Sequence, residues 1–499
     1  MVKKRLGYFA CFMGGLGLVL GGHQPALAAD QPSTPQQTVS STPPSSASPP
    51  ANSTLTNYSW NVVADQGRTV VAVNYQGKIG QLAPQCAKKE PRYPYQLGGM
   101  MRLNDGWLAA SLRSMDATSP SPKSPNRLQN PRGQFDRLLL WQFNPAGQLA
   151  AVLSPPAVSP GKNKKPITHF TDSMAMTDAA TGRLVVGVVN AAADGSALGQ
   201  GDPFALVYER RDNNNWAPTA ALPTEESGWQ QVAGLCLAAN KDFVLLGHPT
   251  GGVSIFEKLK GNDAAMTTAT GAEWRRRGLF GFGCEQATFA GNQAISLSNG
   301  RLYQLQHSMP AWLDSKKPLV FRDQASLTPY EEQVAVGDNL LIASDNLRQT
   351  IHLYVRDAQN PGAWLQQTTL SRHVNNADGN WGARAFGRRL ALTDHQLLVV
   401  DRLSTKPVSI KSDANDNLAV NTMLGDPFVD QLQIFERNKV DGVWSFKTMV
   451  TAKTLAQSQK LAVMTLNPQS CQPEIPRDPT AQMVGNRPVL SVLYVLPTP

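Results

Sequence analysis

Four cysteines lie beyond the N-terminal apolar run of this 499-residue chain, and the chemistry open to them is oxidation to disulfides. They are Cys86, Cys236, Cys284 and Cys471. No two of them have the CxxC spacing of a zinc or dithiol redox site. Disulfides form in oxidising compartments, and four cysteines allow three pairings. Isolated free thiols are the alternative.

The histidines and carboxylates show no spacing that indicates catalysis or metal binding. The six histidines beyond the N-terminal run stand singly, so no HxH or HExxH pattern brings two imidazoles to one face of an element. They are His169, His248, His307, His352, His373 and His395. No G-x-S-x-G motif indicates an exposed serine nucleophile. The sequence therefore predicts no catalytic residue, no cofactor site and no metal site.

Two basic clusters are candidates for contacts with a partner. One contains Lys162, Lys164 and Lys165, and the other is the run Arg275, Arg276 and Arg277. Both fall in predicted loops, where they would meet acidic glycans, lipid headgroups or acidic proteins. Two solvated loops without a partner are the alternative.

The N-terminal segment has the pattern of an export signal. Lys3, Lys4 and Arg5 precede a glycine-rich apolar run, and Ala26-Leu27-Ala28 offers small residues for cleavage. We predict a signal peptide over residues 1–29, with an uncleaved membrane anchor as the alternative. The protein is then exported to the periplasm, the cell surface or the outside of the cell. Nucleic acid is not an expected partner there, although the formal net charge is +9.

Residues 30–57 are Pro, Ser and Thr with almost no apolar side chains, which predicts a disordered linker. From residue 58 onward, short apolar runs alternate with Gly, Asn, Asp and Pro. This texture predicts an all-β domain over residues 58–499.

One four-strand unit recurs along the predicted β domain. Its clearest copy has strands at 390–392, 396–400, 432–437 and 444–450. A second copy has strands at 333–336, 340–343, 351–356 and 364–370. A tryptophan begins the fourth strand in several units, and we predict that it packs in the core: Trp216, Trp274, Trp364 and Trp444.

Units of this kind predict the blades of a β-propeller, because a ring of blades buries faces that one blade leaves open. Six units lie between residues 93 and 454, with partial units at 60–82 and 460–496. Joining the two partial units gives seven blades; eight and six are the alternatives. A Cys86–Cys471 bridge would then secure the closure, and Cys236 would pair with Cys284 across neighbouring blades.

The repeat resembles the FG-GAP blade of integrin alpha subunits and of bacterial exported propellers. Phe386-Gly387, Leu397-Leu398-Val399 and Ile434-Phe435-Glu436-Arg437 carry the resemblance, while Val400-Asp401-Arg402 replaces the Gly-Ala-Pro end of the motif. The family often has calcium loops. The nearest candidate here, Asp413–Asn417, lacks the turn glycine, so a solvated polar loop is the favoured interpretation.

These features predict an exported, monomeric, non-catalytic module that binds a protein or glycan of the cell envelope. The loops around 113–134, 157–168, 190–203 and 402–428 are the expected contact regions. A hydrolase or lyase with its site at the central tunnel is one alternative. A scaffold subunit of an envelope complex is the other. After removal of the signal, no segment is expected to span a membrane.

Overall fold

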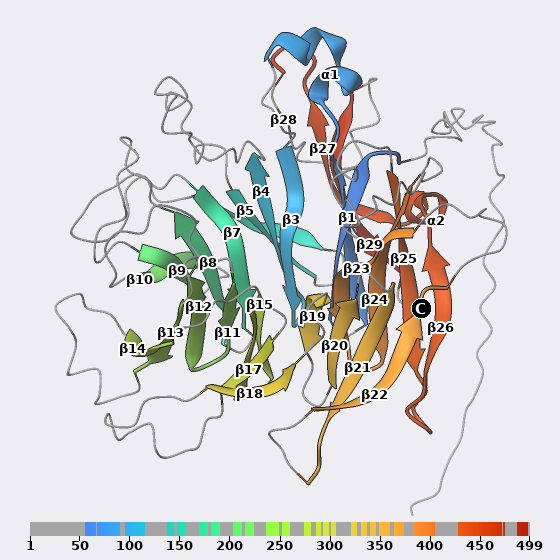
Figure 1. Cartoon of the computed structure of the whole chain (residues 1–499). Helices are drawn as coiled ribbons and strands as arrows, with labels where there is room; N and C mark the ends of the chain where they lie inside the picture. Colours follow the sequence, from blue (N-terminus) through green and yellow to red (C-terminus); the bar gives the residue numbers. More distant parts are fainter. Residues whose placement is uncertain are drawn as a thin grey trace, which may run out of the picture. The chain divides into compact units, whose positions relative to one another are not determined.

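The computed structural model of the chain describes residues 55–497 with gaps (Figure 1). The longest gaps are 115–136, 155–168, 190–202, 224–235, 260–273, 306–320, 374–382, 405–427 and 475–486. The chain divides into residues 1–52 and 53–499, and every described residue belongs to the second unit. The signal peptide and nearly all of the linker lie outside the described residues, so their boundaries stay predictions.

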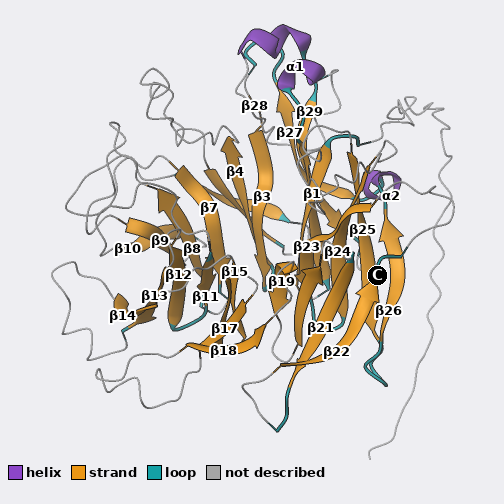
Figure 2. Cartoon of the chain, in the orientation of Figure 1, coloured by secondary structure: helices purple, strands orange, loops and turns teal. Residues whose placement is uncertain are grey.

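Strands form nearly all of the regular structure in the described part (Figure 2). Within the described residues, five sheets contain four antiparallel strands each. The first contains β3 (Tyr95–Asn104), β4 (Trp107–Ser114), β5 (Arg137–Gln142) and β6 (Gln148–Leu153). The second contains β7 (His169–Met176), β8 (Arg183–Val189), β9 (Pro203–Arg210) and β10 (Trp216–Pro223). The third contains β11 (Leu237–Ala239), β12 (Phe243–His248), β13 (Gly252–Lys258) and β14 (Trp274–Phe280). The fourth contains β15 (Gln286–Ala290), β16 (Gln293–Ser298), β17 (Arg301–Leu305) and β18 (Phe321–Ser326). The fifth contains β19 (Glu331–Val336), β20 (Leu340–Asp345), β21 (Thr350–Arg356) and β22 (Trp364–Ser371).

A nine-stranded sheet joins the last repeat unit to both ends of the domain. Its first part contains β23 (Ala383–Leu392), β24 (Gln396–Ser404), β25 (Phe428–Arg437) and β26 (Trp444–Val450). Its second part contains β1 (Tyr58–Asp65), β2 (Arg68–Tyr75), β29 (Val489–Leu496), β27 (Gln459–Leu466) and β28 (Pro473–Glu474). A single parallel pairing of Tyr58 with Val429 connects the two parts. The helices are short: α1 (Ile79–Leu82), the 3-10 helix Pro84–Lys89 and α2 (Ala452–Ala456).

The first strands of successive four-stranded sets contact one another in a closed order. Among the described residues this order is β1, β3, β7, β11, β15, β19, β23 and back to β1. Four-stranded antiparallel sheets joined in this way form a β-propeller, so the predicted fold class is confirmed. The number of seven blades stays a prediction, and the closed order of these strands supports it.

Apolar runs without alternation arise because both faces of a sheet are buried. On β8, Leu184 and Val186 pack against the sheet of β3–β6, whereas Val185 packs against the sheet of β11–β14. All three side chains are fully buried. Burying each of them contributes about 1.5 to 3 kcal/mol. Each unit therefore depends on its two neighbours, as the repeat pattern predicted.

The recurring tryptophans begin outer strands and lie opposite basic residues. Trp216, Trp274, Trp364 and Trp444 are buried, which confirms their predicted packing role. Their cross-strand partners are, in order, Arg210, Lys258, Arg356 and Arg437. The Arg356 guanidinium carbon lies 4.9 Å from the centre of the Trp364 ring, within cation–π range. In the unit of β19–β22, the basic residue that ends β21 and the tryptophan that begins β22 thus form one contact, whereas Arg210 lies over Trp107 and Trp274 lies under Arg183.

The Phe-Gly element of β23 forms a bulge. The strand continues on both sides of this bulge, so β23 is longer than the predicted strand 390–392. From Phe386 to Arg389, β23 advances three residues while β24 advances one, from Asp401 to Val400. Gly387 lies in this bulge with a φ of +88°. A Cβ atom there would lie 2.5 Å from the Cβ of Ser344, on the neighbouring sheet. Only glycine satisfies both the backbone conformation and the close approach.

We expect Gly387→Ala to lower the free energy of unfolding by about 2 to 4 kcal/mol, because left-handed strain and overpacking add. Gly442→Ala is the matched control: Gly442 also has a positive φ, of +71°, but the atom nearest to its added Cβ would be an Arg437 side-chain nitrogen at 3.4 Å. The control should cost only the left-handed strain, about 1 to 2 kcal/mol. Urea unfolding of both variants checks this, and equal losses would show that the contact with Ser344 contributes nothing.

The two ends of the domain close the structure within one sheet. β2 pairs with β29 from Thr69–Leu496 to Asn74–Ser491, so N-terminal and C-terminal strands share hydrogen bonds. This confirms the predicted joining of the partial units. Ser491 also donates to Asn74 Oδ1 at 2.6 Å, and Asn74 Oδ1 accepts the backbone N–H of Leu97 on β3. The closure therefore extends into the first four-stranded sheet.

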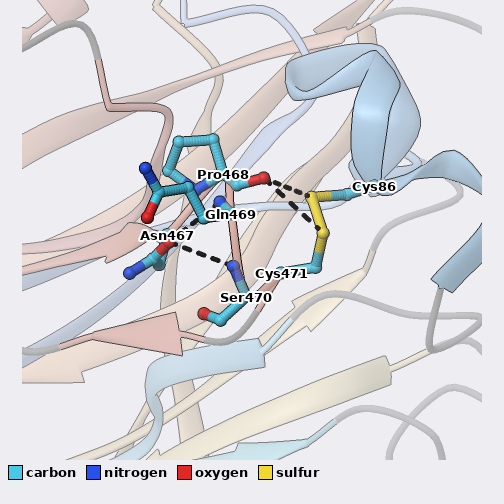
Figure 3. The surroundings of a disulfide bond; sticks show 6 residues. All are labelled: Cys86, Asn467, Pro468, Gln469, Ser470 and Cys471. Atoms are coloured by element: carbon cyan, nitrogen blue, oxygen red, sulfur yellow. Dashed lines mark hydrogen bonds between the residues drawn. A yellow bond between two sulfur atoms is a disulfide. The ribbon is translucent and has the colours of Figure 1, made fainter.

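A disulfide between Cys86 and Cys471 secures the same closure, as predicted (Figure 3). Cys86 belongs to the 3-10 helix after α1, and Cys471 follows β27. Their Cα atoms lie 5.6 Å apart, within the range of unstrained bridges. Both side chains are buried beside the carbonyl of Pro468. Cys236 is also disulfide-bonded, and Cys284, its predicted partner, lies outside the described residues.

Candidate functional site

The most polar buried region of the nine-stranded sheet lies where β24 ends and β25 begins. We call it the polar end of β24 and β25; its members are Asp401, Arg402, Asp430, Gln431, Gln433, Arg372 and His373. In the register of these strands, Asp401 lies opposite Gln431, and Arg402 lies opposite Asp430. Strand alternation separates the set into two faces. One face continues Leu397 and Val399, and the other continues Leu398 and Val400.

Asp401 occupies the first face with one carboxylate oxygen fully used and the other unused. Its Oδ2 atom accepts hydrogen bonds from Arg372 Nε at 2.7 Å, Gln431 Nε2 at 2.8 Å and Gln433 Nε2 at 3.1 Å. Its Oδ1 atom is buried and has no hydrogen-bond partner. Asp401 is 0% exposed. Buried polar atoms are nearly always paired, so an unpaired carboxylate oxygen requires an explanation, of which a catalytic role is one.

Burial raises the pKa of the Asp401 carboxyl above its ordinary value, against the opposing effects of Arg372, Gln431 and Gln433. Desolvation disfavours the charged form of an acid, and here it outweighs the attraction of one guanidinium. A carboxylate in this condition is a stronger base than an exposed aspartate. Perturbed carboxylates of this kind cluster at functional sites.

Gln433 holds the segment after β22 against this face. Its Oε1 atom accepts the backbone N–H of His373 at 2.9 Å, and its Nε2 atom donates to the carbonyl of His373 at 3.0 Å. The His373 ring stacks on Phe446, with centroids 3.7 Å apart and planes at 10°. Because Arg372 precedes His373, these contacts fix the backbone from which the Arg372 side chain reaches Asp401.

The second face contains a complete ion pair. Arg402 Nε donates to Asp430 Oδ1 at 2.7 Å, and Arg402 Nη2 donates to Oδ2 at 3.0 Å. The backbone N–H of Trp60 on β1 also donates to Oδ2, at 2.8 Å. The Arg402 guanidinium carbon lies 3.5 Å from the centre of the Phe428 ring. Every charged group of this pair has a partner, which is the arrangement of a structural contact between the two parts of the sheet.

The arginine cluster predicted for a loop lies in a strand instead. Arg275, Arg276 and Arg277 belong to β14, and Arg275 pairs with Glu257 on β13. The prediction was wrong because Trp274 starts the outer strand, and the arginines follow it directly. Charged residues on an outer strand discourage pairing with a further strand, which gives the cluster a structural explanation. Lys162, Lys164 and Lys165 lie outside the described residues.

Most of the predicted contact loops, and the calcium candidate Asp413–Asn417, also lie outside the described residues. Among the residues that the structure describes, no three His, Cys, Asp or Glu side chains form a group that could hold a metal ion. In the same part of the chain, no helix is long and apolar enough to cross a membrane.

Sequence reasoning missed Asp401 and its partners. The one available signal was the departure from the repeat at Val400-Asp401-Arg402, where charged residues continue an apolar strand. Arg372 and Gln433 are separated from Asp401 by 29 and 32 residues, and no spacing rule joins them. Their association depends on strand register.

No family model matches the chain, and no curated protein matches it. Among solved structures, it is similar to the periplasmic gluconolactonase PpgL of Pseudomonas aeruginosa, with 11% identity, a TM-score of 0.39 and coverage of 74% of this chain and 96% of that one. A Bacteroides fragilis protein assigned as a 6-phosphogluconolactonase matches with 10% identity, a TM-score of 0.38 and coverage of 69% and 83%. Hsv2p of Kluyveromyces lactis matches with 9% identity, a TM-score of 0.34 and coverage of 72% and 99%.

These comparisons contradict the prediction of a non-catalytic binding module. Two of the three structures are named for a lactonase activity, which is an enzymatic reaction and not a binding role. The reaction itself belongs to those proteins. At identities of 9% to 11%, the likeness extends to the fold alone.

Proposed function

We propose that this protein is an exported hydrolase in which Asp401 is the general base. The observation that carries the proposal is the unpaired Oδ1 atom of a fully buried carboxylate. The neighbouring carboxylate of Asp430 accepts hydrogen bonds at both oxygens. In Asp401, by contrast, Oδ2 accepts three hydrogen bonds and Oδ1 remains available to accept a proton.

In the proposed reaction, a water molecule attacks the carbonyl carbon of an ester or lactone. Asp401 Oδ1 takes a proton from this water as the new carbon–oxygen bond forms. The bond to the leaving oxygen then breaks, and that oxygen receives the proton from Asp401. General-base catalysis requires hydrogen-bond reach between the base and the water. Because Oδ1 is covered in this structure, side chains around it must shift before water reaches it.

We expect Asp401→Asn to lower kcat by about 100-fold or more, because the amide cannot accept the proton. The assay is acid release from a panel of lactones and carboxylic esters, followed by titration at constant pH. Asp430→Asn is the matched control: it makes the same chemical change at an equally buried position whose oxygens are all paired. Circular dichroism establishes that both variants are folded at the assay temperature. Full activity in Asp401→Asn would refute the proposal.

The pH dependence provides a second prediction. A general base works in its ionised form, so the rate falls as pH drops through its pKa. An ordinary aspartate titrates near pH 4. Since burial raises the pKa of Asp401, the acidic limb of kcat/KM should lie at a higher pH than that. The residual activity of Asp401→Asn should lack this limb. A limb at the same pH in both proteins would assign it to another group.

Export and family membership are parts of the same proposal. The basic residues, apolar run and small residues of segment 1–29 support export. The Phe386-Gly387 element supports a degenerate FG-GAP repeat, because Phe386 is buried between sheets and Gly387 occupies the bulge. Secretion of the full-length chain, with loss of its first residues shown by mass spectrometry, tests the export proposal.

A further inference from the structure

Arg372 has a guanidinium that is only partly used. Its Nε atom donates to Asp401, but within the described part of the chain its Nη1 and Nη2 atoms have no partner. The side chain is 13% exposed, so solvent reaches part of it. Arg402 has the same exposure but donates through both Nε and Nη2 to Asp430. Arg372 therefore keeps Nη1 and Nη2 for a ligand, whereas Arg402 uses Nη2 on Asp430.

The position of Arg372 is fixed before any ligand arrives. Asp401 holds Nε, and Gln433 holds the next residue, His373, through both backbone polar groups. A guanidinium held at Nε presents its two terminal nitrogens as a planar fork. That fork matches the paired oxygens of a carboxylate or phosphate group. Little conformational freedom is then lost on binding.

We infer that Arg372 binds an oxyanion, a carboxylate or phosphate group, of the molecule that this site takes. The inference rests on the proposed function, because it places the anionic group of the substrate beside Asp401. Within the polar end of β24 and β25, two arginines balance two aspartates. The site therefore has no net negative charge that would repel a ligand anion. The formal charge is +9 for the whole sequence and becomes +6 when Lys3, Lys4 and Arg5 leave with the signal; it attracts anions to the protein as a whole.

The test is calorimetric titration of the full-length protein with sodium phosphate and, separately, with sodium acetate. Sodium chloride at matched ionic strength corrects for screening. We expect saturable binding at one site for at least one of the two anions. A response to acetate alone indicates a carboxylate ligand, and a response to phosphate alone indicates a phosphorylated one. The absence of saturable binding for both would overturn the inference.

Variants assign the binding to Arg372. Arg372→Gln should weaken it at least tenfold, and Arg372→Lys, which keeps the charge but loses the fork, should weaken it several-fold. The matched control is Arg275→Gln, which removes the same charge from an exposed position on β14. Equal weakening by Arg372→Gln and Arg275→Gln would reveal a general effect of charge and overturn the inference.

The two proposals fail separately. If Asp401→Asn remains fully active while Arg372-dependent anion binding holds, only the general-base proposal fails. If Asp401→Asn loses activity but neither anion binds, only the oxyanion inference fails.

Discussion

Replacing Cys86 and Cys471 together with serine is expected to lower the free energy of unfolding by about 4 to 5 kcal/mol. The bridge spans 385 positions in the sequence, so it removes a large entropy from the unfolded chain. For a folded domain of this size, such a loss corresponds to a fall in Tm of about 5 °C. Scanning calorimetry of the wild type and the double variant measures the difference.

A redox control separates this bridge from the one at Cys236. Reducing the wild type breaks both disulfides, whereas reducing the double variant breaks only the disulfide of Cys236. The difference between the two reductions should match the effect of the double substitution. A double variant as stable as the wild type would mean that the β2–β29 pairing closes the domain without help from the bridge.

The second large effect is expected from Asp430→Ala, at about 3 to 5 kcal/mol of unfolding free energy. This variant leaves the largely buried guanidinium of Arg402, which is 13% exposed, without its counter-charge and the backbone N–H of Trp60 without its acceptor. Both losses occur where the last repeat unit meets β1. Unfolding by guanidinium chloride, followed by tryptophan fluorescence, measures the change.

Two further variants make this prediction specific. Glu436→Ala also removes a carboxylate of β25 from an ion pair, but its partner Lys447 is 48% exposed, and the expected loss is below about 1 kcal/mol. The double substitution Arg402→Met with Asp430→Leu removes both charges and should recover most of the loss. If the single and double variants were equally unstable, packing and not the buried charge would be the cause.

Much of the fold could be predicted because each repeat unit carries local signals. The predicted strand 396–400 lies within β24, and the predicted strand 444–450 coincides with β26. The joining of the terminal units and the Cys86–Cys471 bridge followed from one geometric idea, that a ring of blades must close. The bulge of β23 was not predicted. The Phe386-Gly387 pair does not indicate that three residues of β23 would lie opposite one residue step of β24.

The candidate site could not be predicted for a different reason. Asp401, Arg372 and Gln433 come from separate segments, and a shift of one residue in strand register would place Asp401 on the opposite face. Arg275 shows the reverse error: its type indicated a binding loop, whereas its place beside Trp274 made it part of an outer strand. For Asp401 and Arg275, residue type alone did not show where the backbone would place the side chain.

The pairing of β2 with β29 also has a consequence for biosynthesis. During translation, residues 68–75 are made long before their hydrogen-bonding partner at 489–496. The growing polypeptide therefore carries an unmatched strand edge until β29 has been made. A product truncated before β29 would keep that edge open to aggregation.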